Sequence, residues 1–235
     1  MSIYKEILDS KKKKKKKFVV LIDPDKIDNK NLDIIFKLSF ETDIDYFFIG
    51  GSLLRKDILD ELIIKIKTNT SIPVILFPGS PFQISNKADA ILLLSLISGR
   101  NPELLIGNHV ISAPLLKQYG LEIISTGYML IDGGRVSSTS YISNTIPIPN
   151  DKEDIAVSTS IAAEMIGYKL IYMDAGSGAK ISVSESMTKE VSSNISLPLI
   201  VGGGIDNIEK AKNLCRAGAD IIVVGNAIEK NKSLI

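Results

Sequence analysis

The sequence is poor in reactive side chains, with one cysteine, one histidine and no tryptophan among 235 residues. Because Cys215 stands alone, an internal disulfide and a cysteine-based metal cluster are both excluded. The 28 Lys and Arg nearly balance the 27 Asp and Glu, so no overall field favours nucleic acid as a partner. No apolar run approaches the roughly 20 residues of a membrane span, and no apolar signal segment precedes the first strand. We therefore expect a soluble, cytoplasmic protein.

The only low-complexity tract is the run of seven lysines from Lys11 to Lys17. We interpret it as a solvated charge run that ends a first helix spanning Met1 to Lys17. Peripheral contact with an anionic membrane surface is the alternative interpretation.

A short repeated pattern predicts the fold. Each copy has a helix end, an aspartate, four or five apolar residues and then a small residue, as in Asp45 to Gly50, Asp89 to Ser95 and Asp220 to Gly225. Such repetition is typical of βα units, and strands that are apolar on both faces fit a parallel sheet covered by helices. With eight strands in the chain, we predict a (β/α)8 TIM barrel that forms a single domain over residues 1–235.

Two stretches of this barrel are expected to be irregular. The prolines of Phe77 to Phe82 leave little room for a helix, so the third helix position should be irregular. We expect the fifth strand at Leu121 to Ile124. The hairpin-type turn Asp132 to Arg135 then suggests that Tyr128 to Val136 is a small excursion above the barrel.

Three strands in succession run into glycine-rich segments, namely Tyr172 to Ala179, Gly202 to Ile205 and Gly225 to Ala227. In parallel barrels, loops at these late strands form the usual phosphate site. Glycines that merely permit tight turns would explain any one of the segments, but they explain three in series poorly. The sequence therefore predicts a phosphate site at the carboxyl ends of the strands.

Across the same face, Asp23, Asp25 and Ser52 offer oxygen atoms to a hard cation such as Mg²⁺. An Asp-Pro-Asp segment is also often just a turn with a side-chain cap. We interpret His109 and Cys215 as packing residues. Three aspartates that precede strands at the opposite face are interpreted as structural: Asp45, Asp89 and Asp220.

The chain resembles the geranylgeranylglyceryl phosphate synthase and heptaprenylglyceryl phosphate synthase family. The resemblance is carried by Leu21 to Lys26, Ile49 to Ser52, Ile75 to Ser80, Tyr172 to Ala179 and Val223 to Ile228. It implies a modified barrel whose third helix is replaced. It also implies a Mg²⁺-dependent prenyltransferase, in which the hydroxyl of sn-glycerol 1-phosphate attacks C1 of a polyprenyl diphosphate and forms an ether lipid precursor.

Carried over position by position, the resemblance places Mg²⁺ on Asp23 and Ser52. We expect Asp174 to accept the proton and Tyr172 to position the hydroxyl. Many members have glutamate at position 174. The glycerol phosphate would lie against Tyr172, Met173, Asp174, Ala175, Gly176, Ser177, Gly178, Gly203, Gly204, Gly225 and Asn226.

For the prenyl tail we expect an apolar groove built from Leu93 to Ile97, Leu104 with Leu105, and Tyr128 to Ile131. Leu21 stands where some bacterial members carry lysine, so the chain is nearer the archaeal-like subgroup and a geranylgeranyl substrate is expected. The alternatives are a phosphosugar isomerase, epimerase or lyase, and then a non-catalytic phosphate- or flavin-binding barrel. Apolar helix faces on barrels often mediate self-association, so a homo-oligomer is expected.

Overall fold

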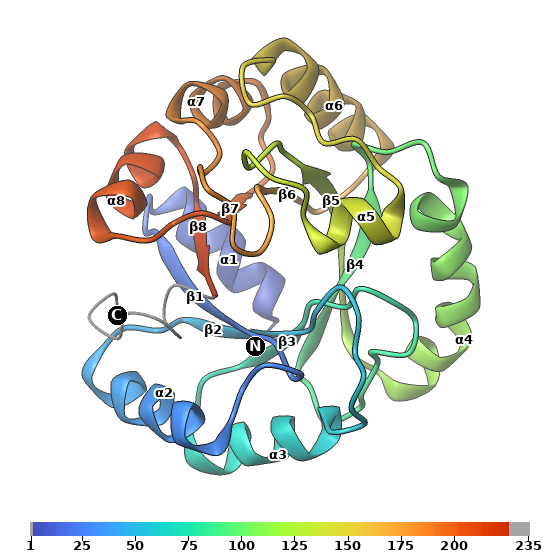
Figure 1. Cartoon of the computed structure of the whole chain (residues 1–235), viewed down its shortest axis with the longest axis vertical. Coiled ribbons are helices and arrows are strands. Elements are labelled where there is room, and N and C mark those ends of the chain that lie inside the picture. The colour runs from blue at the N-terminus through green and yellow to red at the C-terminus, as the bar shows by residue number, and fades with distance from the viewer. Residues whose placement is uncertain (1, 226–235) are drawn as a thin grey trace.

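The computed structural model describes residues 2–225, and its strands form a closed parallel barrel in sequence order (Figure 1). The strands are β1 (Lys17–Ile22), β2 (Tyr46–Ile49), β3 (Val74–Leu76), β4 (Ala90–Leu96), β5 (Glu122–Leu130), β6 (Leu170–Asp174), β7 (Leu199–Gly202) and β8 (Ile221–Val224). The predicted (β/α)8 barrel is therefore confirmed.

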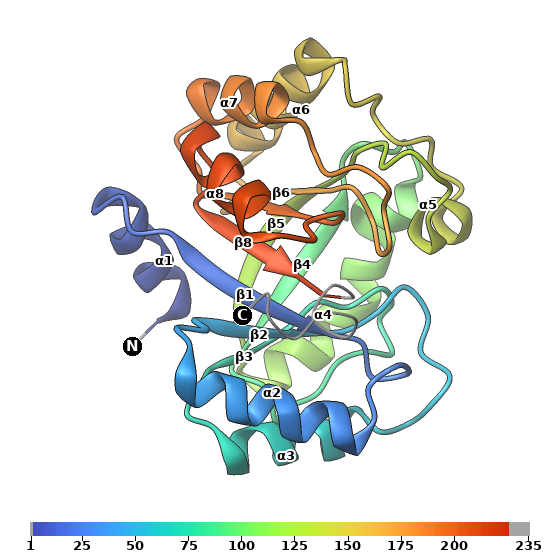
Figure 2. The same ribbon diagram turned by 60° about the vertical axis from the view of Figure 1, so that its left-hand side comes forward.

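Helices surround this barrel, and one closes its amino-terminal end. They are α1 (Ile3–Lys12), α2 (Asn29–Glu41), α3 (Leu59–Asn69), the π-helix η1 (Glu103–Gly107), α4 (Asn108–Tyr119), α5 (Ser138–Ser143), α6 (Glu153–Ile166), α7 (Glu185–Asn194) and α8 (Ile208–Ala217). α1 and α5 lie at opposite ends of the barrel (Figure 2). Residues 77–89, all of which the structure describes, contain no helix, which confirms the irregular third position. Within residues 2–225, no helix is both long and apolar enough to cross a membrane.

Alternation along the strands divides the apolar side chains into two layers. One cluster fills the barrel interior and includes Tyr46, Phe48 and Tyr172. Ile3 and Ile7 of α1 belong to the same interior cluster, so this helix closes the floor of the barrel. The second cluster lies between the strands and the surrounding helices. Because the interior is filled by side chains, ligands are restricted to the open end of the barrel.

The three repeated aspartates connect neighbouring strands at the amino-terminal end. A carboxylate oxygen of Asp45 accepts from the Phe18 amide at 2.8 Å, and Asp89 accepts from the Val74 amide at 2.8 Å. Asp220 accepts from the Leu199 amide at 3.0 Å. Each carboxylate accepts a hydrogen bond from an amide near the start of another strand, which confirms the structural role that the sequence predicted.

Replacing Asp220 with alanine is expected to destabilise the barrel. The substitution leaves the buried Leu199 amide without its acceptor and removes the ion pair with Lys11 at 2.7 Å. The free energy of unfolding in urea should fall by about 1–3 kcal/mol, the cost of an unsatisfied buried donor. The matched control is Glu209→Ala, whose partner Lys212 lies 3.6 Å away in an exposed pair. Equal effects in the two variants would contradict the structural role.

The structure corrects two sequence predictions. α1 ends at Lys12, and Lys14 has a positive φ of 56°. Lys17 begins β1 instead, and its ammonium is buried between the carboxylates of Glu6 and Asp45, at 2.6 and 2.8 Å. β5 continues to Leu130 rather than ending at Ile124, because residues 126–130 pair with β6 over its whole length. Tyr128 is therefore a barrel residue and not part of an excursion.

Candidate active site

A cavity of about 580 Å³ lies at the carboxyl ends of the strands. It brings together most of the residues that the sequence predicted for the site. Its lining includes Asp23, Ser52, Tyr172, Asp174, Gly176, Ser177, Gly178, Gly203, Gly204 and Gly225. The expectation that glycine loops and an oxygen-rich wall face each other across one mouth is therefore met.

Strand alternation in β6 decides which predicted residues reach this cavity. Tyr172 and Asp174 line it, whereas Met173 and Ala175 belong to the hydrophobic layer under the surrounding helices. The side chains of Met173 and Ala175 are therefore not placed to contact a ligand in the mouth. Asn226 lies outside the residues that the structure describes.

Asp174 is held rigidly at the end of β6. One carboxylate oxygen accepts from the Gly176 amide at 2.7 Å, and the other accepts from the Tyr128 hydroxyl at 2.6 Å. Burial raises the pKa of the Asp174 carboxyl, and these two hydrogen bonds oppose the increase. The carboxylate is therefore more basic than an exposed aspartate and has a fixed orientation.

The two tyrosines beside this carboxylate remain protonated. Burial first, and then the Asp174 charge, raises the pKa of both Tyr128 and Tyr172 well above its ordinary value. The rings meet edge to face with centroids 5.4 Å apart. Tyr128 can therefore act as a hydrogen-bond donor to Asp174 at neutral pH, and the two rings form a packed aromatic pair of which Tyr172 lines the cavity.

The glycines at the end of β7 are required by close approach. A Cβ on Gly202 would lie 2.6 Å from the Tyr172 hydroxyl oxygen. A Cβ on Gly203, whose φ is 80°, would lie 2.7 Å from a carboxylate oxygen of Asp174 and from the Gly176 nitrogen. The β6 and β7 loops therefore form one closely packed backbone surface, which is the kind of surface that receives a phosphate group.

On another part of the cavity wall, Asp23 and Asp25 both line the cavity but have different partners. Asp25 is engaged by the Arg55 amide at 2.9 Å and the Lys56 amide at 3.1 Å, so it joins two loops. One carboxylate oxygen of Asp23 accepts from the Asp25 amide at 3.0 Å, and the Lys26 ammonium lies 2.6 Å from the other oxygen. Backbone amides thus engage both oxygens of Asp25, whereas the second oxygen of Asp23 is paired with a lysine side chain.

The irregular segment after β3 fixes the loop that carries Ser52. The side chain of Gln83 is buried, accepts from the amides of Gly51 and Gly79, and donates to the Gly51 carbonyl at 2.8 Å. The hydroxyl oxygen of Ser52 lies 3.0 Å from that of Thr139 in α5. The segment that replaces a regular helix therefore fixes the loop so that Gly51 lies against Asp23 and Ser52 against α5.

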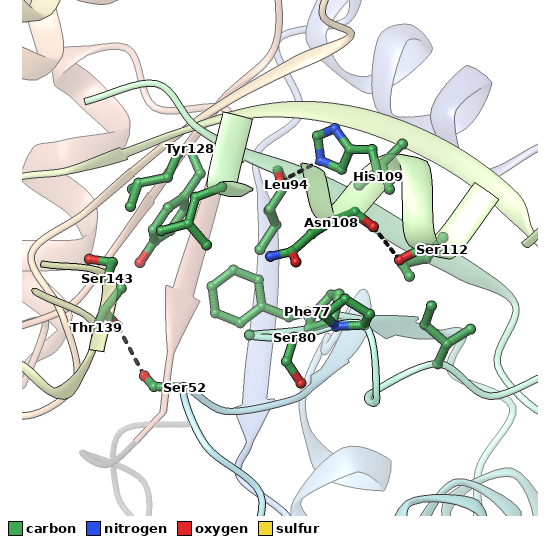
Figure 3. Close-up of a pocket in the computed structure, with 18 of the residues that line it drawn as sticks. Ser52, Phe77, Ser80, Leu94, Asn108, His109, Ser112, Tyr128, Thr139 and Ser143 are labelled. Carbon is green, nitrogen blue, oxygen red and sulfur yellow. Dashed lines mark hydrogen bonds between the residues drawn. The ribbon is translucent and has the colours of Figure 1, made fainter. Parts of the chain in front are cut away.

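A second, mainly apolar cavity of about 150 Å³ leads away from the mouth between β4, α4 and α5. Figure 3 shows the Phe77 ring projecting into it, with Tyr128 and Thr139 on one side and His109 on the other. A ring nitrogen of His109 lies 2.7 Å from the Leu94 carbonyl oxygen, so the imidazole has a hydrogen-bond partner within the fold. The two cavities share Gly51, Ser52, Phe77, Thr139 and Ile142.

Some of the residues predicted for the tail groove line this apolar cavity, and others do not. Leu93, Leu94, Leu96, Leu104 and Tyr128 line the apolar cavity. Met129 and Ile131 instead pack under the helices, because alternate residues of β5 face opposite sides of the barrel wall.

Two residues of the site were missed by the sequence interpretation, namely Thr139 and Gln83, and Tyr128 was predicted for the tail groove but not for its hydrogen bond to Asp174. For Tyr128 a signal was present, because the register places it directly beside Tyr172 once β5 is extended. Thr139 lies in α5, a short helix that begins at the Ser137 cap and that none of the expected elements covers. Nothing in the spacing of the chain marks Gln83.

Fold and site together define a (β/α)8 barrel with a glycine-lined mouth and an apolar groove that adjoins it. The PcrB family matches residues 11–235, and the chain belongs to this family.

Relatives with known names agree with this assignment. A geranylgeranylglyceryl phosphate synthase from Chitinophaga pinensis is 58% identical over 99% of this chain and 92% of its own length. One from Pyrococcus horikoshii is 42% identical over 92% of this chain and 84% of its own length. The (S)-3-O-geranylgeranylglyceryl phosphate synthase of Thermoplasma acidophilum, crystallised with its substrate sn-glycerol-1-phosphate, is 34% identical. It superposes with a TM-score of 0.93 and covers 100% of this chain and 94% of that chain.

Proposed function

We propose that this protein transfers a polyprenyl group, of geranylgeranyl length, from its diphosphate to sn-glycerol 1-phosphate. The observation that carries the proposal is the junction of the two cavities. The apolar groove and the glycine-lined mouth share one wall at Ser52, Phe77 and Thr139. A lipid tail in the groove would place its reacting end beside a phosphate-bearing alcohol in the mouth. The names of the relatives at 42–58% identity support the same reaction.

The glycerol phosphate is proposed to lie on the backbone surface formed by the β6 and β7 loops. Gly176, Gly178, Gly203 and Gly204 all have positive φ, so their backbone turns along the cavity wall with no side chain in the way. The alcohol then points towards Asp174, which lies beside Tyr172 in the same wall. The structure of the Thermoplasma acidophilum relative with sn-glycerol-1-phosphate supports a glycerol phosphate site in this fold.

In the proposed reaction, the free hydroxyl oxygen of glycerol phosphate forms a bond to C1 of the prenyl chain. The bond from C1 to the diphosphate oxygen breaks, and its electron pair leaves with the diphosphate. Asp174 accepts the hydroxyl proton, a role for which its raised pKa is favourable. The Tyr128 hydrogen bond holds the carboxylate in the orientation that this transfer requires.

The residues of the opposite wall fit a magnesium ion. The Asp23 carboxylate lies against Gly51, so a carboxylate and the Ser52 hydroxyl line the same edge of the mouth. Residues 2–225 hold no cluster of three or more side chains of the kinds that ligate metals. One carboxylate and one hydroxyl suit a cation that retains waters and takes further oxygens from a substrate phosphate. Bound there, magnesium would neutralise the charge of the departing diphosphate.

The proposal is tested by incubating the protein with labelled sn-glycerol 1-phosphate and polyprenyl diphosphates of increasing length. With Mg²⁺ we expect a butanol-extractable product, made most efficiently from geranylgeranyl diphosphate. Removing the metal with EDTA should lower the rate by about 100-fold or more, because the leaving group then carries its charge unassisted. A rate unaffected by EDTA would contradict the role given to Asp23 and Ser52, and a preference for another length would contradict the geranylgeranyl assignment.

A further inference from the structure

The carboxylate proposed for the metal already has a cationic partner in this structure. The ammonium of Lys26 lies 2.6 Å from Oδ2 of Asp23, and the Asp25 amide donates to Oδ1 at 3.0 Å. The Asp23 side chain is 17% exposed and that of Lys26 is 49% exposed. The ion pair is therefore open to the cavity on the lysine side, where a ligand would arrive.

The neighbouring aspartate is held by more partners than Asp23. Both carboxylate oxygens of Asp25 are engaged, one with the amide and Nε of Arg55 and the other with the Lys56 amide. Asp23 is therefore the ligand that we assign to a divalent cation at this wall, and to reach Oδ2 the cation must displace the Lys26 ammonium. Metal binding at this wall is a competition with a resident lysine.

The displaced ammonium stays at the mouth of the barrel. The Lys26 amide donates to the Asp23 carbonyl at 3.1 Å, so the backbone of this turn is fixed. Only the flexible side chain moves, and both Lys26 and Arg55 line the cavity. An ammonium released here is within reach of an anion bound at the same wall, where it would form charge-assisted hydrogen bonds.

We propose that Lys26 is an exchangeable counter-ion, which neutralises Asp23 in the free enzyme and moves to the diphosphate when metal and diphosphate bind together. The inference rests on the proposed function for the identity of the anion. Its consequence is that free metal binds weakly, whereas metal and diphosphate assist each other. The enzyme would thus select the metal-bound form of the prenyl diphosphate.

The inference makes opposite predictions for two ligands in Lys26→Met. Manganese alone should bind about two- to fivefold more tightly than to the unmodified protein, because a partly exposed ion pair no longer competes. Inorganic pyrophosphate in the presence of Mg²⁺ should bind about tenfold more weakly, because one charge-assisted contact is lost. A residue with a merely structural role would change both affinities in the same direction.

Manganese binding is measured by electron paramagnetic resonance, and pyrophosphate binding by calorimetry with Mg²⁺ present. Lys30→Met is the matched control, because it removes one exposed lysine near the start of α2, shortly after the turn that carries Lys26. Lys26→Gln provides a second variant should the methionine variant fold poorly. The expected result is that the manganese and pyrophosphate affinities shift in opposite directions in the Lys26 variants and do not shift in this way in Lys30→Met. An unchanged or parallel shift in either titration, or no manganese binding to any of these proteins, would overturn the inference.

These titrations involve no prenyl transfer, so their outcome is separate from that of the proposed function. If the unmodified protein forms the ether product but the Lys26 variants bind both ligands normally, the inference fails and the function stands. If the opposite shifts occur but no prenyl substrate is used, the counter-ion role stands and the proposed reaction fails.

Discussion

Asp174→Asn is expected to lower kcat by about 100-fold or more, the usual contribution of a positioned general base. Asparagine keeps the size of the side chain. Its carbonyl oxygen can still accept from the Gly176 amide, and the Tyr128 hydroxyl can accept from its amide group. The KM for sn-glycerol 1-phosphate should therefore change by less than about threefold, because the lost interaction is made only as the proton moves. Steady-state kinetics with both substrates measures the two quantities, and an unchanged kcat would remove Asp174 from the mechanism.

The pH dependence of the same variant provides its control. Burial raises the pKa of Asp174 in the folded protein, so folding favours the protonated carboxyl. That contribution is fully present below the ordinary aspartate pKa of about 3.9 and is lost as pH rises through the raised value. Asp174→Asn does not ionise, so its Tm should equal or exceed that of the unmodified protein at neutral pH. The kcat of the unmodified protein should fall as pH decreases through the raised pKa. A variant with a lower Tm at pH 7 would contradict this account.

Gly203→Ala is expected to lower kcat/KM by about 100-fold, because a misplacement of about 1 Å in a reacting group has effects of this size. The new methyl group would lie 2.7 Å from both Asp174 Oδ1 and the Gly176 nitrogen. No Cβ is tolerated at that distance, so the carboxylate and the β6 loop must both move. The measurement is kcat/KM for sn-glycerol 1-phosphate at a saturating concentration of prenyl diphosphate.

Gly120→Ala is the matched control for this substitution. Gly120 also has a positive φ, 66°, but a Cβ there would meet no atom within 4 Å. Both variants carry the backbone strain of a left-handed alanine, and only one displaces the catalytic carboxylate. A similar loss of activity in the two variants would mean that general destabilisation, rather than disruption of the site, explains the effect.

The barrel could be predicted from the sequence because its signals are local and repeated. Asp45, Asp89 and Asp220 each immediately precede a buried strand, and each carboxylate accepts a hydrogen bond from an amide of a neighbouring strand, so the repeat reflects a shared structural need. The glycines of the β6 and β7 loops were predictable for the same reason. Close approach between backbones excludes side chains and leaves a readable pattern.

The remaining parts of the site depend on contacts between distant residues. Tyr128 and Asp174 are 46 positions apart and meet only because β5 continues to Leu130 beside β6. Gln83 reaches Gly51 across 32 positions from a segment without periodicity. Apart from the family resemblance, the residue pattern could not separate Asp23 from Asp25, because the hydrogen bonds that Arg55 and Lys56 donate to Asp25 come from another loop. Side-chain partners that are fixed by tertiary structure leave no local signal.

The measurement that tests the account most directly compares sn-glycerol 1-phosphate with sn-glycerol 3-phosphate as acceptors for geranylgeranyl diphosphate in the presence of Mg²⁺. A fixed carboxylate on one side of the mouth and a fixed phosphate surface beside it should accept one enantiomer. We therefore expect ether product from the 1-phosphate and essentially none from the 3-phosphate. Equal use of both enantiomers would contradict the geometry assigned to Asp174. No product from either acceptor, with any prenyl length, would contradict prenyl transfer itself. It would favour the alternative of a phosphosugar isomerase, epimerase or lyase that uses the glycine-lined mouth.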